Sequence, residues 1–173
     1  MVAAYLGAAT LYVVGLLIRD AYELLKRRGR IDTTDVRVFA VVFTSMCVMW
    51  LSWFAVGVLA PTHLALPSAV RATGVGAVLI GVVLAVAGMW QLGGVENIDH
   101  LVKTRLFSRI RHPMYVGFVL WILGWYAYTG AWTSLLFAPF GIASVLWWRH
   151  LEETELASRY GSEYEEYRAV TWF

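Results

Sequence analysis

Charged residues are scarce in this chain of 173 residues, of which Asp, Glu, Lys and Arg make up only 15%. A soluble domain normally carries nearer a quarter. Hydrophobic residues account for 60% of the chain, and the mean hydropathy is +0.62. This balance excludes an ordinary soluble domain and indicates an integral membrane protein of one domain, with no nucleic-acid partner expected.

Cysteine is rarer still. Cys47 is the single cysteine and lies in an apolar run, which excludes a disulfide framework and a cysteine-based metal site. No metal is expected at Asp99-His100 either, because no further carboxylate or histidine completes a ligand spacing. Residues 1–20 lack the basic region of a signal peptide, so we interpret them as a retained first span.

Long apolar runs, separated by charged or Pro/Gly-containing breaks, are abundant. They predict five transmembrane helices, because each run is near the ~17–25 residues that a helix needs to cross the hydrocarbon. The predicted spans are residues 2–18, 38–60, 72–92, 113–129 and 131–148. The sequence thus predicts an all-α integral membrane protein.

The last two predicted spans are separated only by a short break around Gly130, which predicts a tight helical hairpin. A polar helix broken near Gly161 is expected to continue the fifth span. A second short helix is expected to follow it, ending in the aromatic pair Trp172 and Phe173. This C-terminal helix would lie outside the bilayer.

The distribution of basic residues predicts the orientation. All but one of the 14 Lys and Arg residues fall in residues 19–37, in residues 93–112 or after residue 148. The exception is Arg71, in the loop 60–71. Because cytoplasmic loops carry the excess of positive charge, the three basic segments are expected inside and the N-terminus outside. All 12 acidic residues lie on the same predicted side, so the chemistry is expected at the cytoplasmic face.

Three polar groups follow the cytoplasmic ends of the last three predicted spans. They are "VENIDHLVK" at residues 95–103, Arg111-His112-Pro113 with Tyr115, and Glu152-Glu153. Because the fourth and fifth spans form a hairpin, its two cytoplasmic ends must be neighbours. We therefore expect Arg111 and His112 beside the two glutamates. Pro113 suits the first turn of a helix and would hold His112 extended.

Each of these residues also has an ordinary interpretation. Arg111 could be one more inside-positive anchor, and His112 could cap a carbonyl group. Glu152 and Glu153 could be a solvated helix turn, and the aromatic residues of the hairpin could be packing and interface residues. Only the combination and its spacing favour a functional site.

That combination resembles a known family. "HLV" at 100–102, "RHPMYVG" at 111–117 and "EETELASRYGSEYEEY" at 152–167 flank the aromatic-rich hairpin. Together they resemble the isoprenylcysteine carboxyl methyltransferases and their bacterial relatives and, more loosely, the related phospholipid methyltransferases. The resemblance covers about residues 88–170. It implies one membrane domain over residues 1–173, with accessory N-terminal spans in 1–71 and a methyltransferase core in 72–173.

The resemblance also implies a site for S-adenosylmethionine, with S-adenosylhomocysteine as the product. It assigns cofactor binding to His100, Leu101, Val102, His112, Pro113, Tyr115, Glu152, Glu153 and Tyr164. One of the two glutamates would receive the ammonium group of the cofactor. Arg111 would lie between cofactor and substrate, and the expected catalytic residues are Arg111 and Glu152. Tyr160, Tyr164 and Tyr167 would close the site as part of the tail helix.

Two departures from the family pattern concern the loop over this site. Members commonly have a Gly-x-Tyr turn shortly before Arg-His-Pro, whereas this chain has Arg105 where Gly is expected. The stretch from Gly93 to His100 is also shorter than usual. Both departures affect the prediction of the acceptor more than the prediction of the cofactor.

The sequence therefore predicts a membrane methyltransferase that acts on a lipid-like or otherwise apolar acceptor. A carboxylate or thiol acceptor is favoured because it is already nucleophilic and needs orientation rather than a strong base. The acceptor would arrive from the bilayer and the cofactor from the cytoplasm, at a bacterial inner membrane, with membrane lipids as further partners. The oligomeric state stays open.

Three alternatives remain. The first is a methyltransferase for small thiols or amines on the same scaffold, and the second is a non-catalytic membrane assembly factor with a degenerate site. The third is a reductase related to the sterol reductases. Residues 152–166 are acidic, which disfavours the reductase because the phosphates of a nicotinamide cofactor need basic residues.

Overall fold

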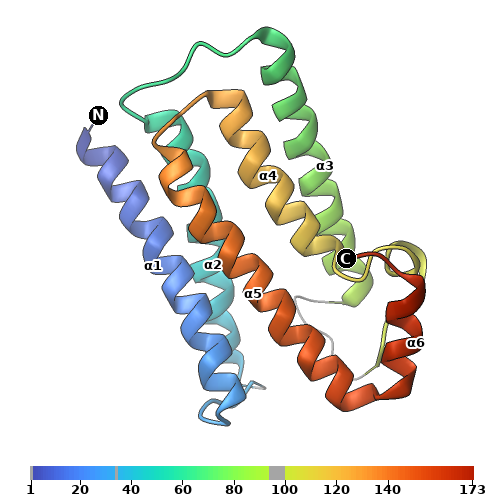
Figure 1. Cartoon of the computed structure of the whole chain (residues 1–173). Helices are drawn as coiled ribbons and strands as arrows, with labels where there is room; N and C mark the ends of the chain where they lie inside the picture. The colour runs from blue at the N-terminus through green and yellow to red at the C-terminus, as the bar shows by residue number, and fades with distance from the viewer. Residues whose placement is uncertain (1, 34, 94–99) are drawn as a thin grey trace.

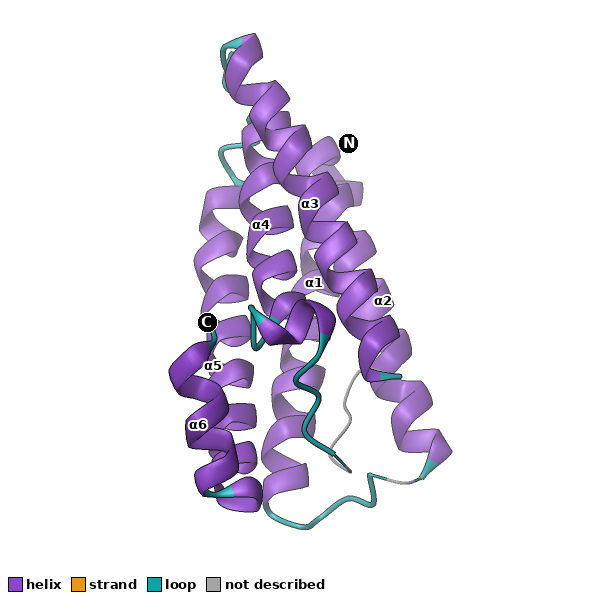
Figure 2. Ribbon diagram, turned by 90° about the vertical axis from the view of Figure 1, so that its right-hand side faces the viewer, coloured by secondary structure: helices purple, strands orange, loops and turns teal. Residues whose placement is uncertain are grey.

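The computed structural model describes residues 2–33, 35–93 and 100–173. Its elements are α1 (Val2–Arg27), α2 (Val36–Leu59), α3 (Ser68–Leu92), the short 3-10 helix η1 (Arg105–Ser108), α4 (Pro113–Thr129), α5 (Ser134–Tyr160) and α6 (Ser162–Val170). The five long helices run side by side, and α6 turns back from the end of α5 toward the start of α4 (Figure 1). Figure 2 shows the same bundle after a quarter turn. The predicted all-α class is confirmed for the described residues.

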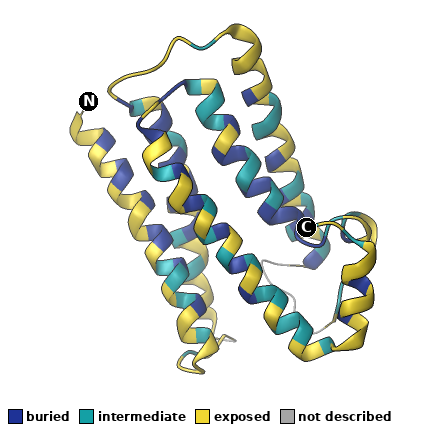
Figure 3. Cartoon of the chain, in the orientation of Figure 1, coloured by how far each residue is buried: buried dark blue, intermediate teal, exposed yellow. Residues whose placement is uncertain are grey.

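Three of these helices, α1, α2 and α3, are long and apolar enough to cross a membrane. Their outer faces carry large apolar side chains, of which Leu17, Leu51 and Leu79 are each more than half exposed (Figure 3). Contiguous apolar surface of this kind is suited to lipid rather than to water. The protein is therefore an integral membrane protein. Because α4 has 17 residues and α5 ends in a polar stretch, the count of five spans stays a prediction.

The helix bounds depart from the predicted spans where polar residues begin. The fourth predicted span, 113–129, coincides with α4. In contrast, α1 continues to Arg27 instead of ending at residue 18, so the first half of the predicted loop 19–37 is helical. The α5 helix continues to Tyr160, where Gly161 adopts a positive φ of 52° and separates it from α6. The polar helix broken near Gly161 was thus predicted correctly.

Pairing between α1 and α5 explains why these polar ends stay helical. Lys26 Nζ lies 3.2 Å from Glu155 Oε2, and Arg27 donates a hydrogen bond of 2.5 Å to the Leu151 carbonyl group. One turn earlier, Arg19 is paired with Glu23, and both side chains are buried. Partners on α5 for Lys26 and Arg27, and a partner within α1 for Arg19, compensate for the loss of water around these charges.

Glycine residues allow α3 and α4 to pack closely. Gly74, Gly81 and Gly88 recur every seven residues on α3. Gly74 faces Gly124 and Gly81 faces Gly117 of the antiparallel α4, whereas Gly88 faces Met114. A Cβ atom added to Gly81 would lie 2.6 Å from the Gly117 carbonyl oxygen, and one added to Gly124 would lie 2.7 Å from the Gly74 carbonyl oxygen. Small residues at such spacings let membrane helices approach backbone to backbone.

The turn between α4 and α5 takes only four residues. Gly130 ends α4 with a positive φ of 68° and donates a hydrogen bond of 2.8 Å to the Tyr126 carbonyl group. Its own carbonyl group accepts a bond of 2.8 Å from the amide of Leu64, which ties this turn to the α2–α3 connection. The chain then runs back beside α4 as α5 (Figure 1). The two ends of α4 and α5 opposite this turn are thereby brought together.

Replacing Gly81 by alanine is expected to destabilise the protein by about 1–3 kcal/mol, because the added methyl group meets backbone that cannot move away cheaply. The matched control is Gly76→Ala on the same helix, where an added Cβ meets nothing within 4 Å. That substitution should be neutral or slightly stabilising, since alanine favours the helix. Thermal unfolding of both variants in detergent measures the difference, and equal midpoints would contradict close α3–α4 packing.

Candidate active site

The Arg-His-Pro segment forms the entry to α4. Pro113 is the first residue of the helix, where its missing N–H costs no hydrogen bond, and His112 precedes it with φ −126° and ψ 63°. The predicted helix start at Pro113 is present, but the prediction of an extended His112 is wrong, because its ψ of 63° is too small for extended backbone although the residue is not helical. Arg111, His112 and Tyr115 are all at least nine-tenths buried.

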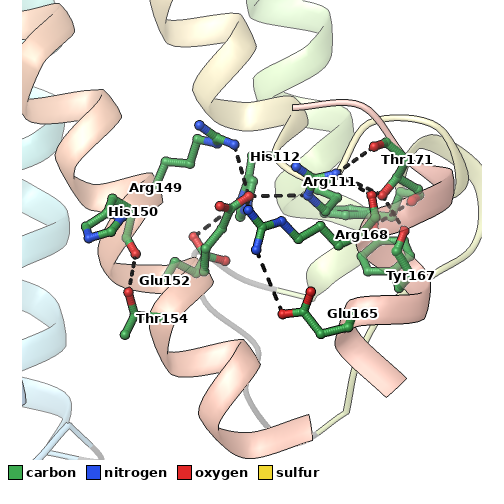
Figure 4. Close-up of polar contacts among 12 residues, drawn as sticks. Arg111, His112, Arg149, His150, Glu152, Thr154, Glu165, Tyr167, Arg168 and Thr171 are labelled. Carbon is green, nitrogen blue, oxygen red and sulfur yellow. Dashed lines mark hydrogen bonds and ion pairs between the residues drawn. The ribbon is translucent and has the colours of Figure 1, made fainter. Parts of the chain in front are cut away.

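The carboxylate of Glu153 is the centre of this site. Its Oε1 lies 3.3 Å from Arg111 Nε, 3.4 Å from His112 Nε2 and 3.0 Å from Arg149 Nη2. Glu152 is more peripheral, with Oε2 3.8 Å from His112 Nδ1 and a side chain that is 31% exposed. Figure 4 shows Arg111 and His112 meeting the side chains of α5. The structure thus brings together the two predicted stretches.

The surroundings of Glu153 keep it ionised. Its contact with His112 is the largest cause of a pKa lowered to about 2, and the nearby charges of Arg149 and Arg111 act in the same direction. Burial opposes them by raising the pKa, but its effect is smaller. A half-buried carboxylate with several positively charged or N–H-bearing neighbours is a strong point of attachment for the segments that carry them.

Arg111 also binds the C-terminal segment. Its Nη1 donates hydrogen bonds to the Thr171 carbonyl group at 2.6 Å and to the Arg168 carbonyl group at 3.2 Å. The backbone adds two more bonds, from the Arg111 amide to the Trp172 carbonyl group at 3.0 Å and from the Trp172 amide to the Arg109 carbonyl group at 2.8 Å. One guanidinium group therefore joins α5 to the tail that follows α6.

Sequence reasoning missed two participants in this site. Arg149 lies four residues before Glu153 on α5, a helical pairing distance that the sequence already displayed. Thr171 could not have been found, because the turn of the tail brings its carbonyl and hydroxyl oxygens to Arg111 from a distant part of the sequence. The predicted role of Arg111 at the cofactor boundary is untested, but its contacts in this structure are with protein groups.

The tyrosines of α6 face the same site. Tyr164 is fully buried, and its hydroxyl group has no hydrogen-bond partner within the described residues. Burial, reinforced by the charge of Glu153, raises its pKa to about 12. Tyr167 donates a bond of 2.6 Å to the Phe107 carbonyl group and so fastens α6 to η1. Tyr160, the third predicted lid residue, is the last residue of α5 and half-buried.

The predicted cofactor segment 100–102 lies in an extended stretch next to α6. Lys103, directly after it, forms an ion pair of 2.7 Å with Glu163 of α6. His100 is exposed, whereas Val102 is half-buried and packs against the main hydrophobic cluster. Leu101 is also half-buried. The remaining part of the predicted polar group, residues 95–99, lies outside the described residues, so Asp99 is not placed.

Arg105 takes up a backbone conformation that normally belongs to glycine. Its φ is +55°, which is costly for a residue with a Cβ atom. This is the position at which the family pattern has Gly, so the loop keeps the shape that glycine would give. The side chain is exposed, and the Arg105 carbonyl group accepts a bond of 2.6 Å from Ser108 Oγ that steadies the turn.

Rings on one face of α4 connect the polar site with an apolar cavity. The centroids of His112 and Tyr115 lie 5.6 Å apart, those of Tyr115 and Phe118 6.0 Å, and those of Phe118 and Trp121 4.9 Å. Tyr115, Phe118 and Trp121 line a cavity of about 160 Å³ between α1, α2, α3, α4 and α5, to which α2 contributes Trp50. Tyr115 therefore faces both the polar site and this cavity.

Comparison with known proteins identifies the family. The family model described as phospholipid methyltransferase matches residues 69–163, which is more than half of the chain. The chain belongs to the phospholipid methyltransferase family. The matched region begins in α3 and ends in α6, so it contains Arg111, His112 and Glu153, whereas the tail carbonyl groups that Arg111 binds lie beyond it.

A second comparison concerns an individual protein. Over 80 aligned positions, this chain is 36% identical to the protein-S-isoprenylcysteine O-methyltransferase of Schizosaccharomyces pombe (strain 972 / ATCC 24843). The alignment covers 42% of this chain and 32% of that protein, so the chain spans about a third of the relative's length. Among solved structures there is no significant match. The expected resemblance to membrane methyltransferases of these two kinds is confirmed.

Replacing Arg105 by glycine is expected to stabilise the protein by up to about 1 kcal/mol. Relief of a left-handed backbone is worth roughly 1–2 kcal/mol, and the greater freedom of glycine in the unfolded chain offsets roughly 0.5–1 kcal/mol of it. The control Arg105→Ala removes the same side chain but keeps the strain, so its unfolding midpoint should match the wild type. A midpoint raised equally by both substitutions would point to the side chain instead.

Glu153 predicts a specific dependence of stability on pH. Its pKa is lowered from 4.5 to about 2, so its contribution is complete above pH 4.5 and is lost as the pH falls toward 2. Thermal unfolding midpoints of the wild type and Glu153→Gln should therefore converge as the pH is lowered through this range. The exposed Glu165→Gln serves as the control and should track the wild type. A constant gap between wild type and Glu153→Gln would contradict the ionised state.

Proposed function

We propose that the protein is an S-adenosylmethionine-dependent methyltransferase that transfers a methyl group to a lipid-like or otherwise apolar acceptor carrying a carboxylate or thiol. Family membership supports methyl transfer in a membrane. The observation that carries the rest is the meeting of Arg111 and His112 with Glu152 and Glu153 directly beside an apolar cavity. A polar cofactor and an apolar acceptor need such adjacent environments.

The residues present fit the cofactor. Its ammonium group needs a carboxylate, and Glu152 offers one that is partly exposed and lies 3.8 Å from its nearest charged or ring nitrogen. Glu153 is a poorer candidate because Arg111, His112 and Arg149 already surround it. The buried hydroxyl group of Tyr164, which lacks a partner in the part of the chain that the structure describes, provides a further polar atom for the ligand.

The proposed division of labour follows from these contacts. Glu152 is the catalytic-site residue that touches the cofactor, and Arg111 is a positioning residue that holds Glu153 and the tail in place. When bound, the cofactor supplies a methyl group on a positively charged sulfur. Because a carboxylate or thiol acceptor is already nucleophilic, the task of the protein is alignment, which supplies about 7–11 kcal/mol in well-oriented reactions. Tyr115 lies where the two ligands would meet.

The proposal includes a membrane arrangement. We place five spans in a bacterial inner membrane, with the N-terminus outside and the polar site at the cytoplasmic face, on the basis of the basic segments after α1 and α3 and after residue 148. Residues 1–71 would be accessory spans, and residues 72–173 the methyltransferase core. The acceptor would enter from the bilayer and the cofactor from the cytoplasm.

Calorimetric titration of the detergent-solubilised protein with S-adenosylhomocysteine tests this function. The wild type should bind, and Glu152→Gln should bind about tenfold more weakly or worse, because a hydrogen bond to a charged group is worth roughly 1.5–3 kcal/mol. Glu165→Gln, an exposed carboxylate of α6, is the matched control and should bind normally.

The outcomes separate the alternatives. No binding by the folded wild type contradicts the methyltransferase and favours the non-catalytic assembly factor. Binding that Glu152→Gln leaves unchanged contradicts only the assignment of Glu152. Transfer of labelled methyl to methanethiol or simple amines, and not to any apolar acceptor, would favour the small-thiol or amine enzyme.

A further inference from the structure

The cavity beside Tyr115 is built jointly by the region that the family model matches and by a part of the chain outside it. Arg19 of α1 and Phe43, Met46, Cys47 and Trp50 of α2 line it, whereas the matched region begins at residue 69. The polar site, in contrast, lies entirely between α3 and the C-terminal segment. The two halves of the protein thus meet at this cavity.

The cavity is small and has a fixed end wall. Its volume of about 160 Å³ is close to that of an engineered cavity of ~150 Å³ that binds benzene. Trp50 packs against Phe118 and Trp121 with centroid distances of 5.0 and 4.7 Å, so three aromatic rings hold one another in place. A wall of interlocked rings cannot retreat cheaply to admit a longer group.

The one charged side chain that lines the cavity is paired with an opposite charge. Arg19 is the one charged residue among those that line the cavity, and it is paired with Glu23 one turn away. The guanidinium group also lies 5.2 Å from the Trp148 ring centroid, and Trp148 Nε1 donates a bond of 2.6 Å to Asp20. These contacts hold the cationic group against its own helix and α5. An uncharged ligand therefore suits the cavity.

The cavity has an opening toward the outer face of α2. Cys47 lines it and is exposed, and Phe43, one turn earlier, is 44% exposed. The opening lies on a helix apolar and long enough to span the membrane, so a ligand can arrive from lipid. At the inner end stands Tyr115, whose ring is 5.6 Å from that of His112.

We propose that this cavity selects the methyl acceptor, that it takes a compact uncharged apolar group about the size of one six-membered ring, and that α1 and α2 determine this specificity. The inference rests on the proposed function and narrows its substrate class. The reactive end of the acceptor would lie near Tyr115, next to the polar site, while its compact group fills the space up to Trp50. Long unbranched chains would be poor acceptors.

For a thiol acceptor, the bonds, the electron pair and the proton of the transfer step are all accounted for. The acceptor sulfur forms a bond to the methyl carbon while the bond from that carbon to the donor sulfur breaks. The electron pair of the broken bond stays on the donor sulfur, and the thiol proton passes to water. No oxidant, reductant or metal is needed.

Cys47 allows a direct test of occupancy, because it is the single cysteine and lines the cavity. The rate of its alkylation by N-ethylmaleimide is measured in the whole detergent-solubilised protein, with cyclohexane or dodecane as the probe and no cofactor. Cyclohexane at about ten times its Kd should slow alkylation about tenfold, whereas dodecane should have little effect. The control variant C47S/L51C carries its thiol on the exposed face of α2, outside the cavity, and corrects for partitioning into the micelle.

A second arm measures methyl transfer from labelled S-adenosylmethionine to benzyl mercaptan and to dodecanethiol. The wild type should prefer benzyl mercaptan, and Trp50→Leu, which removes part of the end wall, should shift the preference toward the longer thiol. Equal protection of Cys47 by both probes, or a preference of the wild type for dodecanethiol, would overturn the inference. If Trp50→Leu does not fold, the wild type alone still tests the inference, through Cys47 protection by the two probes and methyl transfer to the two thiols.

These outcomes are distinct from those that concern the proposed function. Protection of Cys47 is measured without cofactor, so it does not depend on whether the protein binds S-adenosylhomocysteine. Normal binding of S-adenosylhomocysteine with no size preference contradicts the specificity cavity alone. Absent binding with intact protection by cyclohexane contradicts the methyltransferase and leaves a compact apolar site that then needs another role.

Discussion

The site depends on one half-buried carboxylate. The Glu153 carboxylate contacts Arg111 and His112 at the entry to α4 and Arg149 on its own helix. The nitrogen–oxygen distances are all within 3.4 Å. Removing a buried charge from its partners is expensive, so this cluster fixes where the start of α4 lies against α5. Because Arg111 also holds the backbone of the tail, α6 is positioned by the same contact.

The glycine surface between α3 and α4 makes that cluster possible. Backbone-to-backbone contact at Gly81 and Gly117 fixes the lateral position of α4, and the four-residue turn at Gly130 returns the chain as α5. Neither constraint involves a charged side chain. The polar site is therefore located by apolar packing within the bundle and then secured by charge at its end, an order that suits a protein whose helices meet in lipid.

The aromatic face of α4 links two environments of different polarity. His112 belongs to the charged cluster, and Trp121 to the apolar cavity, with Tyr115 and Phe118 between them at intervals of three residues. The ten residues from His112 to Trp121 thus pass from ionic to hydrocarbon-like surroundings. Arg105, in the loop before this helix, has a positive φ that is unusual for a residue other than glycine.

The sequence by itself determined the membrane class, the bounds of α4, the break at Gly161 and the neighbourhood of Arg111, His112, Glu152 and Glu153. Hydropathy, proline and glycine act locally, and a short turn forces the ends of two helices together. Only the tertiary structure decided that residues 19–27 are helical, that Arg111 binds the Thr171 carbonyl group and that α2 closes a cavity against Tyr115. Those features arise from contacts between segments far apart in the chain, and no local pattern of residues encodes which surfaces will meet.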